Sequence, residues 1–344
     1  MKEISVIGLD LAKRVFQVHA VDTAGEVAAQ KRLARAEVLN WFSKIKPCLV
    51  GMEACATSHY WAQELSKLGH DVRLIPPAYV KPYVRRQKND RADAAAICEA
   101  VSRPSMRFAP VKTIEQQSVQ ILHRSRDLLV RQYTQLTNAL RSHLSELGVV
   151  FPFGKAGIAS AMAAVQEPKD DKIPAFVRQV LLSLVGQINQ VKTEIAALNT
   201  QLAAWHQEHA DSQRLAAIPG VGIITATTVI ATVGDGKQFK SGREFAAWIG
   251  LVPRQNSSGG KEQLGSISKK GNIYLRRLLI TGATTQLLGK RRERAPGGLW
   301  FQAVLTRKPA RVACVALANK MARIIWAVLS RGETYRPSTT AVAA

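Results

Sequence analysis

Two aspartates, Asp90 and Asp93, stand three residues apart at the start of the alanine-rich run 88–97, KNDRADAAAI. Such a run favours a helix, which places residues i and i+3 on one face with Cβ atoms about 5–6 Å apart. Two carboxylates held that close are typical ligands for a hard divalent cation, and magnesium is the usual one. The alternative is helix capping, because Asp is favoured at the N-cap and acids are favoured in the first turn.

Two further acids end apolar runs. Asp10 ends the run 4–10, ISVIGLD, and Glu53 ends the run 48–53, CLVGME. Taken singly, Asp10 could be a turn residue and Glu53 a surface acid. Taken with the aspartate pair they predict a four-carboxylate site for two Mg²⁺ ions about 3.5–4 Å apart, suited to phosphoryl transfer. Four basic residues near these acids could hold phosphates or pair with the carboxylates: Lys13, Arg14, Lys88 and Arg91.

A second candidate centre is the run Ser257-Ser258-Gly259-Gly260. Glycines after a serine free the backbone and expose the hydroxyl, although a flexible loop has the same composition. A serine nucleophile needs activation, and no histidine lies near this run in the sequence. Basic neighbours or a metal could lower the cost of forming the alkoxide; the basic candidates are Arg254, Lys261 and Lys269.

The elements that would position the acids follow a recognisable order. Runs 4–10, 15–21 and 26–33 predict an antiparallel meander. After them come a helix, a strand, a helix, a strand and a helix, at 35–45, 48–53, 58–69, 71–75 and from Asp90 to about Val101. This order is that of the ribonuclease H fold, which carries acids at the ends of its first and fourth strands and on a late helix. The predicted domain covers residues 1–110.

Two long helical stretches are predicted next, from about Thr113 to Leu147 and from about Ala175 to His209, within a region assigned to 111–210. The second carries apolar residues that alternate in steps of four and three. They are Val177, Leu181, Leu184, Ile188, Val191, Ile195, Leu198, Leu202 and Trp205. That heptad spacing predicts a coiled coil, which would be a homodimer zipper. The alternative is an antiparallel hairpin of the two helices within one chain.

The remaining region, 211–344, is predicted to be mainly α-helical. Its run 219–222, PGVG, is typical of a helix-hairpin-helix, in which glycines let backbone N–H groups approach a phosphate. A simple Pro-Gly turn between helices is the alternative. The run 312–329 predicts an amphipathic helix near the end of the chain.

The charge balance indicates a polyanionic partner. The 344 residues carry a net charge of +23, and residues 236–344 contain 20 Lys or Arg against four acids. Nucleic acid explains this excess better than a solvated basic surface or an anionic membrane. No signal segment and no bilayer-length apolar run is recognised, so a cytoplasmic protein that does not enter membranes is expected. No CxxC, HExxH or GxxxxGK[ST] pattern occurs, which disfavours disulfides, structural zinc and a nucleotide-binding P-loop.

Several of these runs form a series that resembles a known family. The runs IGLDLAK (7–13), GMEACATSHYWAQEL (51–65) and KNDRADAAAI resemble the N-terminal motifs of the DEDD transposases of bacterial insertion sequences. The runs PGVGIITA, FAAWIGLVPRQNSSGGKEQLGSISKKGNIYLRRLLI and VALANKMARIIWAVL resemble that family's C-terminal transposase domain. The resemblance covers nearly the whole chain.

The resemblance implies a ribonuclease H-like domain in which Asp10, Glu53, Asp90 and Asp93 bind metal. It also implies that Ser258 attacks DNA and forms a covalent phosphoserine link. Family members are similar to recombinases guided by a structured noncoding RNA of the element, and they act as dimers that assemble into tetramers with composite sites. Contacts to nucleic acid are expected at Gly220, Gly222, Arg254, Lys261, Lys269, Lys270, Arg276 and Arg277.

The resulting prediction is a Mg²⁺-dependent recombinase that excises and inserts a mobile element, working in the cytoplasm and on the nucleoid. One alternative is a metal-only nuclease similar to Holliday-junction resolvases, in which water attacks and the serine loop only binds backbone. The other is a basic nucleic-acid-binding scaffold without catalysis. Whether Ser257 or Ser258 is the nucleophile follows only from the resemblance.

Overall fold

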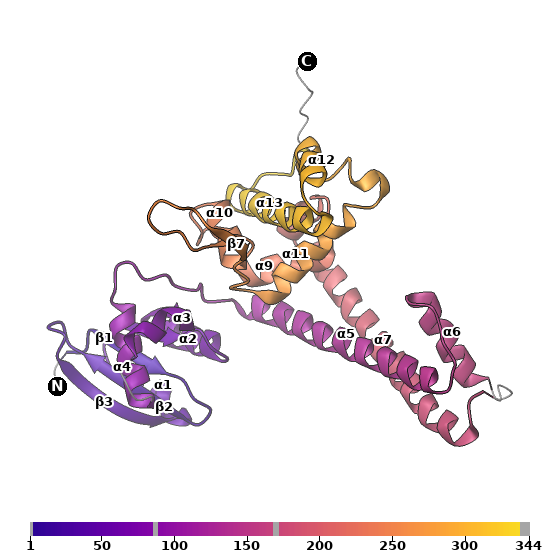
Figure 1. Cartoon of the computed structure of the whole chain (residues 1–344). Coiled ribbons are helices and arrows are strands. Elements are labelled where there is room, and N and C mark those ends of the chain that lie inside the picture. The colour runs from indigo at the N-terminus through magenta and orange to yellow at the C-terminus, as the bar shows by residue number, and fades with distance from the viewer. Residues whose placement is uncertain (1–2, 85–88, 168–171, 338–344) are drawn as a thin grey trace, which may run out of the picture. The chain divides into compact units, whose positions relative to one another are not determined.

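The computed structural model describes residues 3–84, 89–167 and 172–337 (Figure 1). The chain divides into two compact units, Met1–Thr113 and Ile114–Ala344. The predicted regions 111–210 and 211–344 thus fall almost wholly within one unit. Lys88, one of the basic residues expected near the acids, lies outside the described residues.

The N-terminal unit is a mixed α/β domain built on five strands. These are β1 (Val6–Asp10), β2 (Val15–Val21), β3 (Val27–Ala34), β4 (Leu49–Glu53) and β5 (Asp71–Ile75). Its α-helices are α1 (Val38–Phe42), α2 (Ser58–Lys67), α3 (Pro77–Val80) and α4 (Asp90–Val101), with short 3-10 helices η1 (Arg35–Glu37) and η2 (Lys81–Tyr83). The sheet order is β3-β2-β1-β4-β5, with β1, β2 and β3 antiparallel and β1, β4 and β5 parallel. The predicted meander followed by strand–helix alternation is confirmed.

The two faces of this sheet pack against different helices. The alternating residues Phe16 and Val18 of β2 are buried in a cluster with Phe42 of α1 and Trp61 of α2. The opposite face packs on α4, which lies mainly over the central strand β1 and its neighbours, and a smaller cluster that includes Ile97 is buried there. Period-two alternation therefore decides which side chains of β1 and β4 face α4.

Two glycines let α4 lie against the sheet. Gly8 of β1 and Gly51 of β4 are partners in the parallel register. A Cβ at Gly8 would lie 2.1 Å from the carbonyl oxygen of Ala94, and one at Gly51 would lie 2.7 Å from Cβ of Val101. A larger residue at either glycine position would push α4 outward and would move its first-turn acids, Asp90 and Asp93, away from Asp10.

The C-terminal unit is mainly helical. Its α-helices are α5 (Ile114–Glu146), α6 (Lys155–Gln166), α7 (Ala175–Glu208), α8 (Ala210–Ala216), α9 (Ile223–Val233), α10 (Gly242–Ile249), α11 (Ile273–Thr285), α12 (Gly298–Arg307) and α13 (Ala310–Arg331). It also contains the short 3-10 helix η3 (Gly289–Arg291) and a two-stranded ribbon of β6 (Pro253–Gln255) and β7 (Leu264–Ile267).

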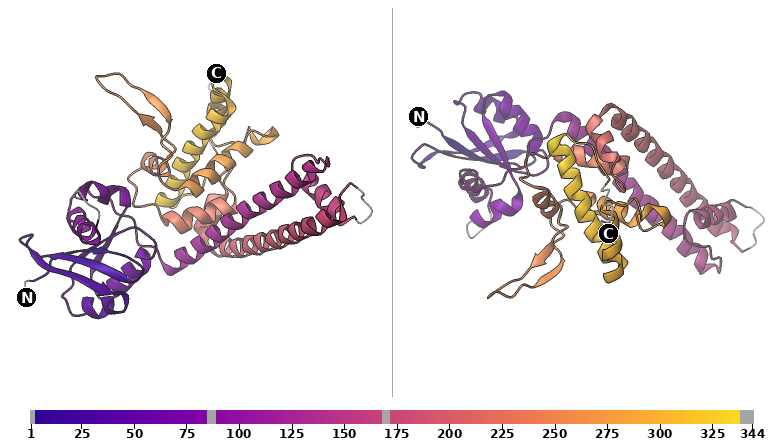
Figure 2. Two further views of the ribbon diagram at one scale, coloured as in Figure 1. Left: turned by 60° about the horizontal axis from the view of Figure 1, so that its bottom comes forward. Right: turned by 90° about the horizontal axis from the view of Figure 1, so that it is seen from above.

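Helices α5 and α7 form an antiparallel hairpin within the single chain, one of the two predicted arrangements (Figure 2). At one end Glu115 of α5 accepts hydrogen bonds from Trp205 of α7 and pairs with His209. At the other end α6 joins a buried cluster with Leu140 and Leu181. Of the nine heptad residues, three are fully buried in this hairpin, and the other six remain partly exposed.

Helix α13 is the central helix of the C-terminal core. It is long and apolar enough to cross a membrane by length and composition alone, which the sequence analysis did not expect. Nine of its residues, among them Leu317 and Ile325, are buried against neighbouring helices including α10 and α11. Packing in a protein core accounts for that apolarity.

A substitution at Gly8 tests the packing of α4. We expect Gly8→Ala to lower the free energy of unfolding by about 3 kcal/mol, because the new methyl group meets backbone atoms that cannot rotate away. Gly186→Ala in α7 is the control: nothing lies within 4 Å of its Cβ position, so a gain of about 1 kcal/mol in helix stability is expected. Urea unfolding followed by circular dichroism measures both, and a Gly8→Ala protein as stable as wild type would contradict the packing argument.

Candidate catalytic sites

Three of the four predicted acids converge at one end of the sheet. Carboxylate oxygens of Asp10, Asp90 and Asp93 lie within 4.8 Å of one another. Glu53 is outside this group of three, but it is close enough to Asp10 to raise the pKa of that carboxyl. The pKa of the Cys55 thiol is raised first by burial and then by Glu53 and Asp10, a second sign that the two strand ends meet.

The register of the sheet places the two strand acids, Asp10 and Glu53, beside each other. Leu9 of β1 is the partner of Met52 of β4, so Asp10 and Glu53 follow at the same level of neighbouring parallel strands. Each acid comes two residues after one of the paired glycines, and therefore points to the same side of the sheet. That side is the one covered by α4.

The other two acids lie at the start of α4. Asn89 is the N-cap of this helix, and its side-chain oxygen accepts a hydrogen bond of 2.8 Å from the amide of Ala92. The capping function that could have explained Asp90 thus belongs to its neighbour. Asp90 and Asp93 both lie in the first turn, where the helix dipole favours negative charge.

The electrostatics of the cluster show what the arrangement costs. The pKa of Asp10 is raised from 3.8 to about 6, first by partial burial and then by repulsion from Asp93, Asp90 and Glu53. Like charges at this separation oppose ionisation of all members together. A cation among them would remove that opposition.

The donor set fits a hard divalent ion. All the candidate ligand atoms are carboxylate oxygens, and oxygens on opposite sides of a bound Mg²⁺ stand about 4 Å apart. The observed spread of 4.8 Å or less requires only small side-chain rotations to reach that value. Asp10, Asp90 and Asp93 would hold the ion, with Glu53 beside them.

The serine run lies on an exposed β-ribbon rather than a flexible loop. Ser258 and Lys261 are bridged across its tip, where the amide of Lys261 donates to the carbonyl of Ser258 at 3.1 Å. Gly259 and Gly260 form the turn between them with φ of +56° and +77°, the combination that two-residue hairpins require. All residues from Pro253 to Ser266 are exposed.

The two serines of the tip differ in their contacts. The hydroxyl of Ser257 accepts a hydrogen bond of 3.3 Å from the amide of Gln263 across the ribbon. The hydroxyl of Ser258 has no hydrogen bond among the residues that the structure describes. Ser258 is therefore the serine whose oxygen is available to an incoming group.

The base of the ribbon is clamped to the helical core. A Cβ at Gly250 would lie 2.2 Å from the carbonyl oxygen of Lys270, and one at Gly271 would lie 1.8 Å from that of Trp248. The guanidinium of buried Arg276 donates to the carbonyls of Ile249 and Lys270 at 2.7 and 2.8 Å. These contacts hold the two ends of the ribbon together.

The predicted nucleic-acid contacts divide into two groups. Arg276 is only 8% exposed, so the structure gives it a role in the clamp and removes it from the predicted contact surface. Gly220 is also explained by packing, since its carbonyl lies 2.0 Å from a Cβ position at Gly282 of α11. The others are exposed: Gly222, Arg254, Lys261, Lys269, Lys270 and Arg277.

Comparison with known proteins identifies the chain's relatives. Residues 7–149 match a family model described as a transposase of the DEDD type found in IS110 elements, and residues 212–296 match one described as "Transposase IS116/IS110/IS902 family". A "Probable family 20 transposase" of Pseudomonas aeruginosa is 49% identical over 97% of this chain and 99% of its own length. The chain belongs to the IS110/IS116 family of transposases.

Two further relatives extend along nearly the whole transposase. The "Transposase for insertion sequence element IS1111A" of Coxiella burnetii is 42% identical over 98% of this chain and 92% of its own. The "Transposase for insertion sequence element IS1328" of Yersinia enterocolitica is 40% identical over 97% and 99%. The protein is thus an enzyme that cleaves and rejoins DNA, and DNA is its substrate.

The residues that position the transposase's acids are not among those predicted from the sequence. The Gly8–Gly51 pair had a signal in the sequence, because both strands end with a glycine, one apolar residue and an acid: GLD and GME. Asn89, directly before the aspartate pair, is a residue type as favourable for the N-cap as aspartate, and it could have been recognised as the cap. The clamp formed by Arg276 had no signal in the sequence, because an arginine that donates to two backbone carbonyls cannot be distinguished there from any other basic residue.

The raised pKa of Asp10 makes its replacement stabilising in the absence of metal. The folded state binds the proton of Asp10 more tightly than the unfolded chain does. Its contribution to stability is therefore fully present below about pH 4, the ordinary pKa of aspartate, and is lost as the pH rises through about 6. We expect Asp10→Asn to strengthen the metal-free N-terminal unit by about 1 kcal/mol at pH 7.5, after allowing for solvent screening. The gain should shrink toward pH 4.

Hydrogen exchange of peptides from β1 and α4 measures this effect within the unit concerned. Added MgCl₂ should protect these peptides in the wild-type protein and leave the Asp10→Asn variant unchanged, while DNA binding persists and strand cleavage is lost. Faster exchange in the variant at pH 7.5 would show that the carboxylates do not repel one another as described.

Proposed function

We propose that this transposase excises and inserts an insertion sequence by Mg²⁺-dependent strand cleavage, with Ser258 as the nucleophile. The observation that carries the proposal is the convergence of acids from β1 and α4 at one sheet end. Residues holding two ions there would be Asp10, Glu53, Asp90 and Asp93. When bound, Mg²⁺ would polarise the scissile phosphate and stabilise the leaving oxygen.

A ribonuclease H-like fold for the N-terminal domain is part of this proposal. Three antiparallel strands followed by two parallel ones, in the order β3-β2-β1-β4-β5, support it. So does the position of the acids at the ends of the first and fourth strands and on a later helix. The order of elements and the position of the site are the two features by which that fold was expected.

The chemistry assigned to Ser258 conserves bond energy. Its Oγ forms a bond to phosphorus as one P–O bond of the DNA breaks, and the serine proton passes to a base while the leaving oxygen takes up a proton. A free DNA hydroxyl of the strand being joined then reverses the step. Because one phosphodiester replaces another, no nucleotide triphosphate is needed, consistent with the absence of a P-loop pattern.

The free hydroxyl of Ser258 supports its choice over Ser257, which is engaged with Gln263. No carboxylate or histidine bonds to Ser258 in the part of the chain that the structure describes. The base must come from elsewhere in the assembly, and the carboxylate site of the same or a second protomer is the group we assign to it. That same lack of a local base favours a second candidate, a metal-only nuclease similar to a junction resolvase.

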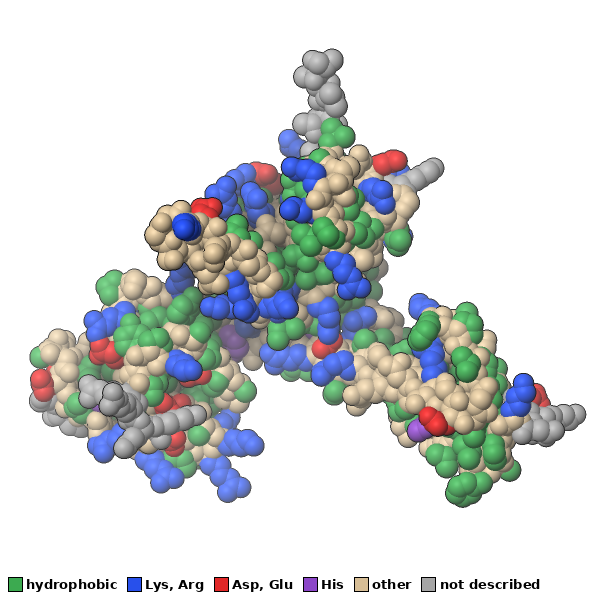
Figure 3. Space-filling view, in the orientation of Figure 1, with side chains coloured by type: hydrophobic (Ala, Val, Ile, Leu, Met, Phe, Trp, Pro, Cys, Tyr) green, Lys and Arg blue, Asp and Glu red, His purple; other side chains and the backbone are tan. Residues whose placement is uncertain are grey.

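The nucleic acid is proposed to lie on the basic surface of the C-terminal unit. Figure 3 shows Lys and Arg side chains outnumbering acids on the visible face of this unit. Exposed Arg254, Lys261, Lys269 and Lys270 place positive charge along the serine ribbon. The turn before α9 exposes Gly222 and Ile223, whose helix start can receive a phosphate as in a helix-hairpin-helix.

A homodimer that assembles into a tetramer completes the proposal. The α5–α7 hairpin leaves a groove of about 520 Å³, partly lined by Leu129 and Leu136 of α5 and by Val191, a heptad residue of α7. Apolar residues left uncovered by the chain itself support a coiled-coil contact with a second copy. A structured noncoding RNA of the element is the proposed guide, for which the charge excess offers binding capacity without specifying its sequence.

Removal of the two serine hydroxyls tests the nucleophile. We expect Ser258→Ala to lower cleavage of element-end DNA by about a thousandfold or more, since a nucleophile has no substitute. Ser257→Ala is the matched control and should stay within about tenfold of wild type. A denaturing gel of the wild-type reaction should reveal a covalent protein–DNA adduct that Ser258→Ala lacks. A Ser258→Ala protein that still cuts would support the metal-only nuclease instead.

The guide is tested by its presence in the purified protein. The transposase should be expressed together with its flanking DNA, and the nucleic acid that copurifies should be sequenced. We expect one discrete RNA encoded beside the gene. Random cellular RNA in proportion to its abundance would contradict the guided mechanism, because charge alone retains RNA without selection.

A further inference from the structure

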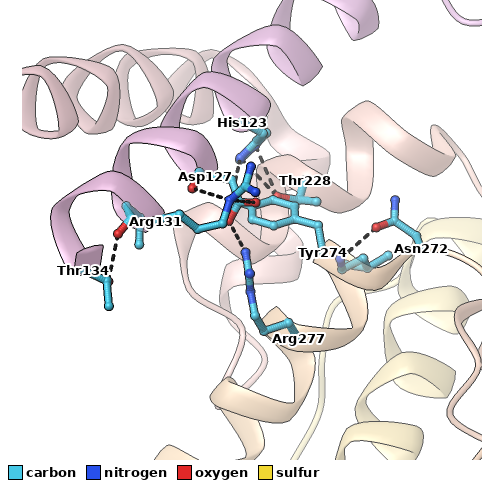
Figure 4. Close-up of polar contacts among 10 residues, drawn as sticks. His123, Asp127, Arg131, Thr134, Thr228, Asn272, Tyr274 and Arg277 are labelled. Carbon is cyan, nitrogen blue, oxygen red and sulfur yellow. Dashed lines mark hydrogen bonds and ion pairs between the residues drawn. The ribbon is translucent and has the colours of Figure 1, made fainter. Parts of the chain in front are cut away.

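A second polar site lies in the C-terminal unit, away from the serine ribbon. A cavity of about 500 Å³ opens between α5 and α11. Its lining contains three arginines, one acid and several neutral polar groups: Arg126, Asp127, Arg131, Thr134, Gln135, Tyr274 and Arg277. Figure 4 shows His123, Asp127 and Arg131 projecting from α5 toward Tyr274 and Arg277 of α11.

The charges of this lining do not cancel. Asp127 pairs with Arg277 across the two helices and lies 3.7 Å from Arg131 on its own helix. The lining thus holds one carboxylate and three guanidinium groups, which leaves two positive charges in excess. A guanidinium has five N–H donors, so the contacts with Asp127 leave donors of Arg131 and Arg277 for another acceptor.

Two of the three arginines, Arg126 and Arg277, are held in place before any ligand arrives. Nε of Arg126 donates to Oδ1 of Asn199 on α7 at 2.6 Å. The guanidinium of Arg277 lies 5.2 Å from the centre of the Tyr274 ring. Side chains fixed in this way lose little conformational freedom on binding, which raises affinity.

A buried network lies beneath the cavity and fixes Tyr274. His123 is 3% exposed, and its Nε2 lies 3.0 Å from the hydroxyl of Thr227 on α9. Its Nδ1 lies 3.5 Å from the hydroxyl of Tyr274 and 3.2 Å from that of Thr228. Burial lowers the pKa of His123 to about 4, with a smaller effect of Arg126, so this histidine stays neutral. The positive charge at the site therefore comes from the arginines alone.

We propose that this cavity binds a phosphodiester group of a nucleic-acid backbone, with Arg131 and Arg277 as the direct contacts. Planar guanidinium groups match phosphate oxygens, and Thr134 and Gln135 add neutral donors at the rim. Arg126 contributes charge at the wall. The inference rests on the proposal that the C-terminal unit contacts nucleic acid, and it assigns a site there that is separate from the serine ribbon.

The competing explanation is that these groups only join α5 to α11. Arg131 separates the two explanations, because its side chain is 63% exposed and its partner Asp127 lies on the same helix. Loss of such an exposed i,i+4 pair costs little stability. An effect of Arg131→Ala on binding cannot then be ascribed to unfolding.

The experiment measures binding of the full chain in EDTA, so that cleavage plays no part. Fluorescein-labelled duplex DNA and single-stranded RNA are titrated separately at several KCl concentrations, and the two arms show which strand occupies the site. Arg131→Ala should lower affinity about fivefold and reduce the slope of log affinity against log salt by about one. Arg131→Ala combined with Arg277→Ala should reduce the slope by about two. Lys192→Ala, an exposed cation of α7 outside the lining, is the control and should change affinity less than twofold.

Arg254→Ala on the serine ribbon separates this inference from the proposed function. If Arg254→Ala weakens binding and both cavity variants match Lys192→Ala on DNA and on RNA, the cavity is not a phosphate site. If none of the variants weakens binding of either strand, the proposed contact surface of the C-terminal unit fails together with the cavity. Weaker binding of either strand by the cavity variants, with an unchanged melting temperature, supports the site, whether or not Arg254→Ala also weakens binding.

Discussion

The close approach of α4 to the sheet is the constraint on which the N-terminal unit depends. Gly8 and Gly51 face each other in neighbouring parallel strands, and α4 occupies the space that their missing side chains leave. Side chains alternate along a strand, so the acids two residues later face the same helix. One feature thus determines both the depth at which α4 packs and the meeting of its first-turn acids with Asp10.

The convergence of these carboxylates is unfavourable in itself, because like charges are more stable apart. The raised pKa of Asp10 shows that partial burial and like charge disfavour its ionised form. Local rules are commonly broken where a site serves function rather than stability. The remainder of the unit offsets the cost through its two apolar clusters, one on each face of the sheet. The acidic pair also lies at the start of the helix, where the positive end of the helix dipole stabilises negative charge.

Much of this architecture was predictable because it is encoded locally. Alternation in 15–21 predicted β2, and apolar runs ending in acids predicted the strand ends that carry Asp10 and Glu53. The heptad stripe predicted a helical hairpin or zipper, and the hairpin forms. The clamp by Arg276 and the arginine cavity were not predictable, because they depend on the packing of distant helices. Arg277 and Asp127 pair although they are 150 positions apart in the sequence, and a contact of that kind cannot be predicted from local periodicity.

The serine ribbon and the carboxylate site differ in how they are built, and the difference bears on control of the reaction. The acids lie on a sheet and a helix whose backbones pack closely against each other. Ser258 lies at an exposed tip, and its ribbon is held at the base by close contacts of Gly250, Gly271 and Arg276. On the proposed mechanism, neither part cuts DNA alone: the serine lacks a base, and the acids lack a nucleophile other than water. Cleavage then requires an assembly on DNA that brings both to one phosphate, which limits strand breakage to complexes in which a joining strand is already held.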